Sequence, residues 1–71
     1  MKVYVLKTEN GWYFCELKAK EYGVCLETTT SSEYATKFTS LNYCDEILCL
    51  LKYLDKKLKT KHNYKIIEVE E

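Results

Sequence analysis

A chain of 71 residues, of which 46% are hydrophobic, has enough apolar material for one small core and is too short for two domains. Its eleven lysines are balanced by eleven acidic residues, and Arg, the preferred residue for reading guanine and gripping phosphate, is absent. This composition argues against a basic nucleic-acid-binding surface, against sequence-specific reading of DNA, and against an acidic imitation of DNA.

The chain begins with two β-prone runs on either side of Asn10-Gly11, a dipeptide typical of tight hairpin turns. A two-residue turn at this point places Thr8 opposite Tyr13 and Leu6 opposite Cys15. Directly opposed residues share a face of the sheet, so the predicted core face carries Tyr4, Leu6, Tyr13, Cys15 and Leu17. The other face is predicted to be mixed, with Val3, Val5, Lys7, Trp12, Phe14, Glu16 and Lys18.

Turn and strand signals continue the pattern after the hairpin. Residues 19–23 contain Gly23 and predict a turn, and Val24–Thr29 predicts a third strand with β-branched residues at both ends. The Thr-Ser stretch over 29–32 predicts a loop. Glu33–Phe38 predicts one helical turn that places Phe38 in the core.

The strongest helical signal follows this loop, with Thr39 or Ser40 as its N-cap. Apolar residues recur at steps of three and four, which predicts one amphipathic face made of Leu41, Cys44, Ile47, Leu48, Leu51, Leu54 and Leu58. Lysines crowd the C-terminal half, where they complement the helix dipole and are expected to be solvated. His62-Asn63 is predicted to close the helix.

Tyr64–Val69 predicts a final strand, which we expect to return beside the first strand. The order is therefore β-β-β-α-β over a single domain, residues 1–71. This order predicts an α+β fold, with an antiparallel sheet of three to four strands and one amphipathic helix packed on one face.

The residues that carry chemistry do not form a recognisable catalytic pattern. The cysteines lack a C-x-x-C pair, and His62 is remote from them in sequence, so zinc and a disulfide framework are disfavoured and the thiols are expected to pack as small apolar groups. Asp45 and Glu46 are adjacent on the helix and point about 100° apart. Gly11 and Gly23 are turn glycines, which leaves no phosphate-binding loop. We expect a protein that is not an enzyme and binds no metal or cofactor.

The sequence also suggests where in the cell the protein is found. A run of about 18 apolar residues is missing, so a membrane span is not expected. The start Met1-Lys2-Val3-Tyr4 leads directly into a strand pattern and does not resemble a signal peptide. We therefore expect the chain to stay in the cytoplasm in which it is made.

The aromatic content is high for a core that one helix covers, with seven Tyr, one Trp and two Phe. Tyr and Trp bring large contact area at low entropic cost and are enriched at binding hot spots. The candidate partner-binding residues are Trp12, Phe14, Tyr22, Tyr43 and Tyr53. Two other interpretations stay open at this point: tyrosines that edge the core with wet hydroxyls, and a homodimer seam.

Three segments carry a resemblance to a known group of proteins. Tyr4–Tyr13 (YVLKTENGWY), Ala35–Phe38 (ATKF) and Tyr64–Val69 (YKIIEV) resemble the hairpin, turn and last strand of small uncharacterised proteins encoded by phages of low-GC Gram-positive bacteria. The resemblance implies a phage accessory protein that acts by binding a host protein, of which the anti-CRISPR proteins are the best-known class. It implies no functional residue, because that group supplies none.

The leading hypothesis is a small phage protein that binds and inhibits a host protein, in particular a CRISPR-Cas or other defence nuclease. It rests on the missing catalytic pattern, the aromatic surplus and the resemblance. The alternative is a homo-oligomeric structural or regulatory module with no defence target. In that case Val3, Val5, Trp12 and Phe14 of the mixed face would form the seam between copies.

Overall fold

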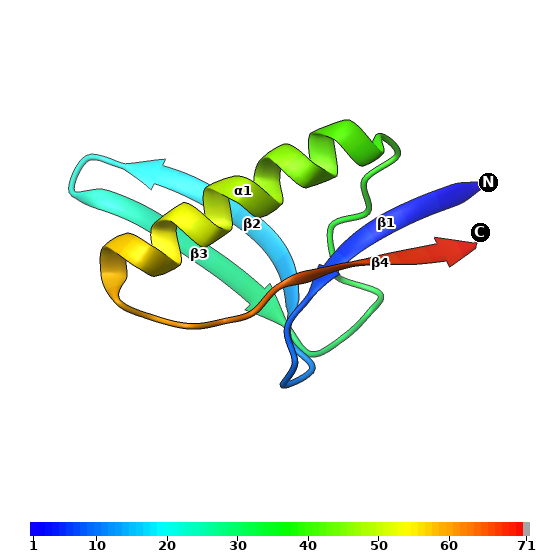
Figure 1. Cartoon of the computed structure of the whole chain (residues 1–71), viewed down its shortest axis with the longest axis horizontal. Helices are drawn as coiled ribbons and strands as arrows, with labels where there is room; N and C mark the ends of the chain where they lie inside the picture. Colours follow the sequence, from blue (N-terminus) through cyan, green and yellow to red (C-terminus); the bar gives the residue numbers. More distant parts are fainter. Residues whose placement is uncertain (71) are drawn as a thin grey trace.

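Over residues 1–70, which the structure describes, a computed structural model shows four antiparallel strands and one helix in the order β-β-β-α-β. The elements are β1 (Lys2–Lys7), β2 (Tyr13–Lys20), β3 (Gly23–Thr29), α1 (Leu41–Leu58) and β4 (Lys65–Glu70). The strand order in the sheet is β3-β2-β1-β4, and α1 crosses one face of it (Figure 1). The α+β fold that the sequence predicts is confirmed.

The last strand returns beside the first, as expected from the sequence. β4 pairs antiparallel with β1 from Lys2↔Glu70 to Lys7↔Lys65. An ion pair joins the Lys2 ammonium to the Glu68 carboxylate at 3.2 Å. The start of β1 and the end of β4 therefore lie side by side at one end of the molecule (Figure 1).

The predicted register of the first hairpin is wrong by one residue. Lys7 pairs with Tyr13 rather than Phe14, because the loop holds three residues, Glu9-Asn10-Gly11, instead of two. The Gly11 N–H donates to the Thr8 carbonyl at 3.2 Å, and Gly11 adopts a φ of +88°. A type I turn followed by a left-handed glycine is the usual three-residue hairpin. The Thr8 hydroxyl accepts a hydrogen bond from the Trp12 N–H at 3.0 Å and holds this loop.

This register reverses the faces predicted at the start of β2. Phe14, predicted on the mixed face, is 4% exposed and packs in the core with Leu6, while Tyr13 and Cys15 lie half-buried on the other side. A one-residue slip moves every side chain to the opposite face of a strand. A bulge between Phe14 and Glu16 then adds a residue and returns Leu17 to the core side, where it was predicted.

The sheet is split between β1 and β2. Within residues 1–70 these strands pair only at Lys7↔Tyr13, beyond which they diverge into a β1–β4 arm and a β2–β3 arm (Figure 1). Thr36–Phe38 fills the start of the gap. Phe38 exchanges two backbone hydrogen bonds of 2.8 Å with Tyr4, and the Thr36 N–H donates to the Phe14 carbonyl at 3.1 Å. The helical turn predicted over Glu33–Phe38 is therefore wrong, whereas the burial of Phe38 is confirmed.

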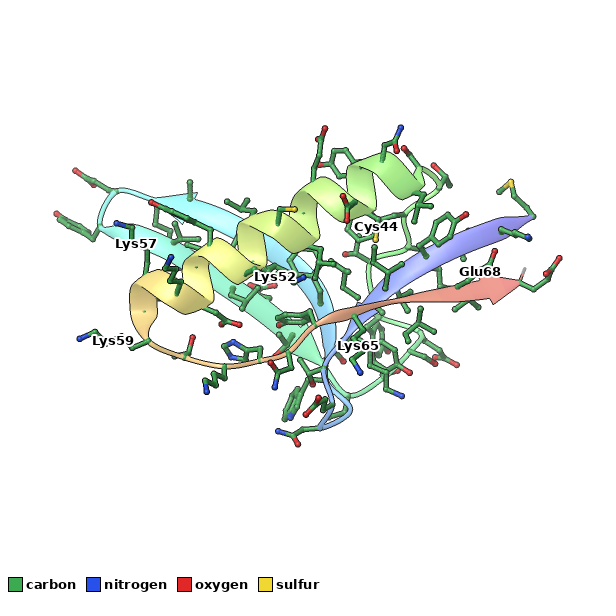
Figure 2. All side chains as sticks on the ribbon, in the orientation of Figure 1. Cys44, Lys52, Lys57, Lys59, Lys65 and Glu68 are labelled. Carbon is green, nitrogen blue, oxygen red and sulfur yellow. The ribbon has the colours of Figure 1, made fainter. Side chains whose placement is uncertain are left out.

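The helix follows the predicted pattern in its middle and differs at its end. Ser40 is the N-cap, and its side chain accepts from the Tyr43 N–H at 3.3 Å. α1 ends at Leu58, earlier than the predicted His62-Asn63, because Lys59 takes a left-handed conformation. Figure 2 shows Lys52 and Lys57 on its C-terminal half and Lys59 directly after its end, and all three are exposed. The core joins both arms to the helix through Leu6, Phe14, Phe38, Cys44, Leu48, Leu51 and Tyr64.

Candidate protein-binding groove

The five aromatic residues predicted to bind a partner lie in separate places. Trp12 follows the hairpin loop and Tyr22 lies in the β2–β3 turn, which are at opposite ends of β2 (Figure 1). Tyr43 is in the first turn of α1, and Tyr53 comes ten residues later. These four are exposed, but Phe14 is buried, with only 4% of its surface accessible. The structure brings together only Phe14 and Tyr43, which line one groove.

This groove is an open hollow of about 1060 Å³ between β2, the segment 34–40 and the N-terminal half of α1. Its apolar part is a row of aromatic rings. The Phe14 and Phe38 ring centres are 6.1 Å apart, and those of Phe38 and Tyr43 are 5.7 Å apart. We call it the β2–α1 groove; its lining residues are Phe14, Cys15, Glu16, Leu17, Glu27, Tyr34, Thr36, Lys37, Phe38, Thr39, Ser40, Tyr43 and Ile47.

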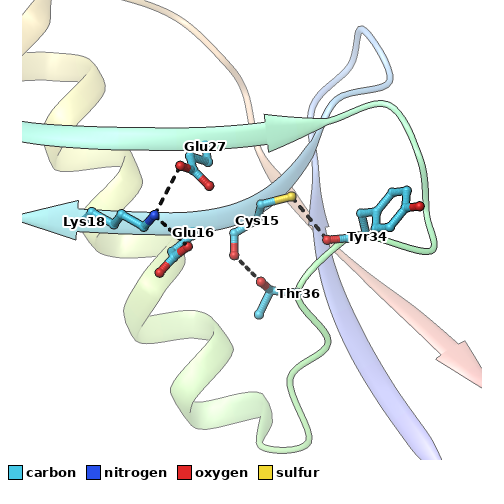
Figure 3. A network of polar contacts seen from close by, with 6 residues as sticks. All are labelled: Cys15, Glu16, Lys18, Glu27, Tyr34 and Thr36. Carbon is cyan, nitrogen blue, oxygen red and sulfur yellow. Dashed lines mark hydrogen bonds and ion pairs between the residues drawn. The ribbon is translucent and has the colours of Figure 1, made fainter.

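The groove exists because β1 leaves β2 after one residue pair. In a continuous sheet β1 would cover the edge of β2, and here Thr36 contacts only the beginning of that edge. Its N–H donates to the Phe14 carbonyl. Its hydroxyl donates to the Cys15 carbonyl, as Figure 3 shows. Beyond Cys15 the edge of β2 opens into the groove.

Two carboxylates lie at one wall of the groove. Glu16 and Glu27 are directly opposed across β2 and β3, and both line the groove. The Lys18 ammonium is 3.6 Å from the Glu16 carboxylate and 3.4 Å from the Glu27 carboxylate (Figure 3). The two carboxylates raise the pKa of Lys18. Since one ammonium balances two carboxylates, this trio carries a net negative charge.

The thiol of Cys15 is in the same region and is not set up as a nucleophile. It donates a hydrogen bond to the Tyr34 carbonyl at 3.2 Å (Figure 3). Burial raises the pKa of Cys15, and the charges of Glu27 and Glu16 raise it further. The protonated thiol is therefore favoured at neutral pH, whereas the thiolate is the reactive form. Nucleophilic chemistry by this thiol is therefore not favoured in the groove.

A second polar cluster closes the helix at its other end. The Asp55 carboxylate accepts from the Thr60 hydroxyl at 2.8 Å and from the His62 N–H at 3.0 Å, and it contacts the His62 ring nitrogen Nδ1. Burial alone would raise the pKa of Asp55, but the hydrogen bonds from His62 and Thr60 outweigh it and leave the pKa below its ordinary value. His62 itself is exposed. The contacts of this cluster hold the helix end.

Neither a family model, nor a curated protein, nor a solved structure matches this chain. Within residues 1–70, no group of three or more His, Cys, Asp or Glu side chains is placed to hold a metal ion. In the same residues α1 is too polar to cross a membrane.

The seam predicted between copies of the chain is not available. Val3, Val5 and Phe14 are each less than 5% exposed, and Phe14 lies on the helix side of the sheet. Of the four predicted seam residues, Trp12 is at the surface. An association of two copies would need a different face.

Of the thirteen residues that line the β2–α1 groove, the sequence predicted only Phe14 and Tyr43 as site residues. The eleven that it missed include Glu16, Leu17, Glu27, Tyr34 and Ile47. The segment Ala35–Phe38 (ATKF) contains one signal, because Phe38 is an apolar residue that the core takes up, although the segment is not helical. Glu16 and Glu27 meet because of the bulge after Phe14. A bulge of this kind has no marker in the local sequence, since neither Cys15 nor Glu16 is a residue that demands one.

Proposed function

We propose that this protein is a small phage-encoded inhibitor that binds a host protein through the β2–α1 groove, and that its target is a defence nuclease such as a CRISPR-Cas effector. The observation that carries the proposal is the groove itself, with an aromatic row along one side and a net negative trio on one wall. An aromatic floor with a polar rim is the usual composition of a protein-binding site.

The negative trio on one wall of the groove supports a partner of a particular kind, although Lys37 also lines the groove. Nucleases bind the phosphate backbone with Lys and Arg, and therefore expose basic surfaces. Glu16 and Glu27 complement such a surface locally, although the whole chain has zero net charge. The sequence resemblance to phage accessory proteins supports a host defence protein as the target.

The test is an affinity capture with tagged chain from a lysate of a low-GC Gram-positive host, followed by a cleavage assay with the captured nuclease. Two tyrosines of α1 provide a matched pair of variants. Tyr43 lines the groove and Tyr53 is outside it, and the two are almost equally exposed, at 54% and 55%. Tyr43→Ala is expected to lose the captured nuclease and the inhibition, whereas Tyr53→Ala keeps both.

Other results would contradict the proposal in distinct ways. If both variants lose the captured nuclease to the same extent, or if both keep it, the binding surface lies outside the groove. Capture of a second copy of the chain and nothing else would favour the homo-oligomeric module. If the captured nuclease still cleaves at saturating concentrations of this protein, the protein binds the nuclease but does not inhibit it.

A further inference from the structure

We propose that the partner of the β2–α1 groove contributes an extended segment, which adds to the free edge of β2 over residues 16–20 as an additional strand. The inference rests on the proposed function and names the chemistry of the partner at that site. The segment alternates apolar side chains with Lys or Arg. Three independent features of β2 lead to this conclusion.

The first feature is the open edge of the strand. β2 pairs with β3 as far as Lys20↔Gly23, but with β1 only at Tyr13 within the part of the chain described. In an antiparallel pair that closes on a two-residue turn, every second residue exchanges backbone hydrogen bonds with the partner strand, beginning with the residue next to the turn. Lys20 is that residue in β2. The backbone groups of Ala19 and Leu17 therefore point away from β3. An unpaired edge of this kind is a template for another strand.

The second feature is that the chain already uses this mode of contact at the start of the same edge. The backbone N–H of Thr36 donates to the Phe14 carbonyl, and its hydroxyl donates to the Cys15 carbonyl. Segment 36–38 thus adds to the edge of β2 for one residue and then passes to Tyr4 of β1. The next positions along the edge, from Glu16 on, lie beside the groove.

The third feature is the difference between the two sides of this edge. On the helix side the groove offers Leu17, Phe38 and Ile47. On the other side it offers Glu16 and Glu27, with Lys18 between them. Successive side chains of a strand point to opposite faces. A segment that fits both sides therefore presents apolar residues to the helix and basic residues to the carboxylates.

The probe for this inference is the labelled peptide acetyl-Thr-Val-Lys-Val-Lys-Val-Thr-amide, titrated into the full chain and followed by fluorescence anisotropy. Two further peptides carry the same side chains with N-methyl groups, either on the three Val amides or on the two Lys amides. In an added strand one of these sets faces β2 and the other faces solvent. We expect one methylated peptide to bind about tenfold or more weakly and the other to bind almost as well as the parent.

Variants of the chain provide the complementary readout. Ala19→Pro removes a backbone N–H that points away from β3, and Ala19→Val keeps it and suits a strand. Peptide binding is expected to fall in Ala19→Pro and to persist in Ala19→Val. A circular dichroism melt checks that Ala19→Pro is folded; if it is not, the methylated peptides decide. A peptide with Glu in place of Lys is expected to bind more weakly than the parent.

Three results would overturn the inference: a parent peptide that does not saturate, methylated peptides that bind alike, or hydrogen exchange of the Leu17 and Ala19 amides that the bound parent peptide leaves unchanged. Failure of the proposed function is seen separately, in the capture and cleavage assays. If a nuclease is captured in a Tyr43-dependent manner but the peptide results are negative, the groove remains the proposed binding site and the strand addition is ruled out.

Discussion

Glu16 and Glu27 stand directly opposite one another across β2 and β3, with the Lys18 ammonium within 3.6 Å of each carboxylate. Like charges in this arrangement oppose the pairing of the two strands. Lys18 offsets that repulsion in part, and all three side chains are about half exposed, so solvent screens the ion pairs. A basic group from a partner would complete the neutralisation.

Replacement of one carboxylate is expected to separate binding from stability. Glu27→Gln removes the opposed charge, so the thermal midpoint should stay the same or rise slightly, while capture of the basic partner weakens. Glu46→Gln on the exposed side of α1 is the matched control and should change neither. Thermal melts and quantitative capture measure the two effects. A large fall in the melting temperature of Glu27→Gln would show that this carboxylate is structural.

Gly11 is expected to be sensitive to β-branched residues because its φ is +88°. A Cβ added at this position meets nothing within 4 Å, so the cost comes from backbone strain and not from crowding of the Cβ. Gly11→Val should lower the free energy of unfolding by about 1–2 kcal/mol or more. Gly11→Asn should lose less, since Asn tolerates the left-handed region. Urea unfolding of both variants measures the difference, and equal losses would contradict the left-handed conformation of Gly11.

Truncation to Ala should destabilise the protein by very different amounts at two neighbouring leucines of α1. Leu51 is 1% exposed and belongs to the core, whereas Leu50 is 40% exposed on the adjacent side of the helix. Leu51→Ala should cost about 2–5 kcal/mol, which is enough to unfold a domain of this size at moderate temperature. Leu50→Ala should cost about 0.5 kcal/mol or less. Similar melting temperatures for the two variants would mean that the helix packs through a different face.

The Asp55 cluster predicts an acid-sensitive contribution to stability. The folded state lowers the pKa of Asp55 below its ordinary value of 3.8, so the folded state binds fewer protons than the unfolded state. The contribution is present above the unfolded pKa and is lost as the pH falls through the lower, folded pKa. Urea midpoints measured at neutral pH and near pH 3 should therefore show Asp55→Asn below the original chain at neutral pH, with a smaller difference in acid. A constant difference between the two proteins would show that ionisation of Asp55 does not matter.

The sequence was sufficient for the parts of this protein that depend on local and periodic signals. Leucine spacing and the Ser40 cap locate the helix, and the final apolar run locates the strand that returns to β1. These signals work because each residue contributes through its own propensity and its own burial. The α+β order and a hairpin at Asn10-Gly11 followed from them.

The tertiary structure decided the register of that hairpin, because Asn10-Gly11 is compatible with a loop of two or of three residues. The three-residue loop that forms places Phe14 under the helix with Leu6, which the two-residue loop would have left on the opposite face. The β2–α1 groove depends on contacts between residues far apart in the chain, such as Phe38 with Tyr4 and Thr36 with Phe14. Such pairings are chosen by the packing of the whole core, so the sequence around each residue contains no signal for them.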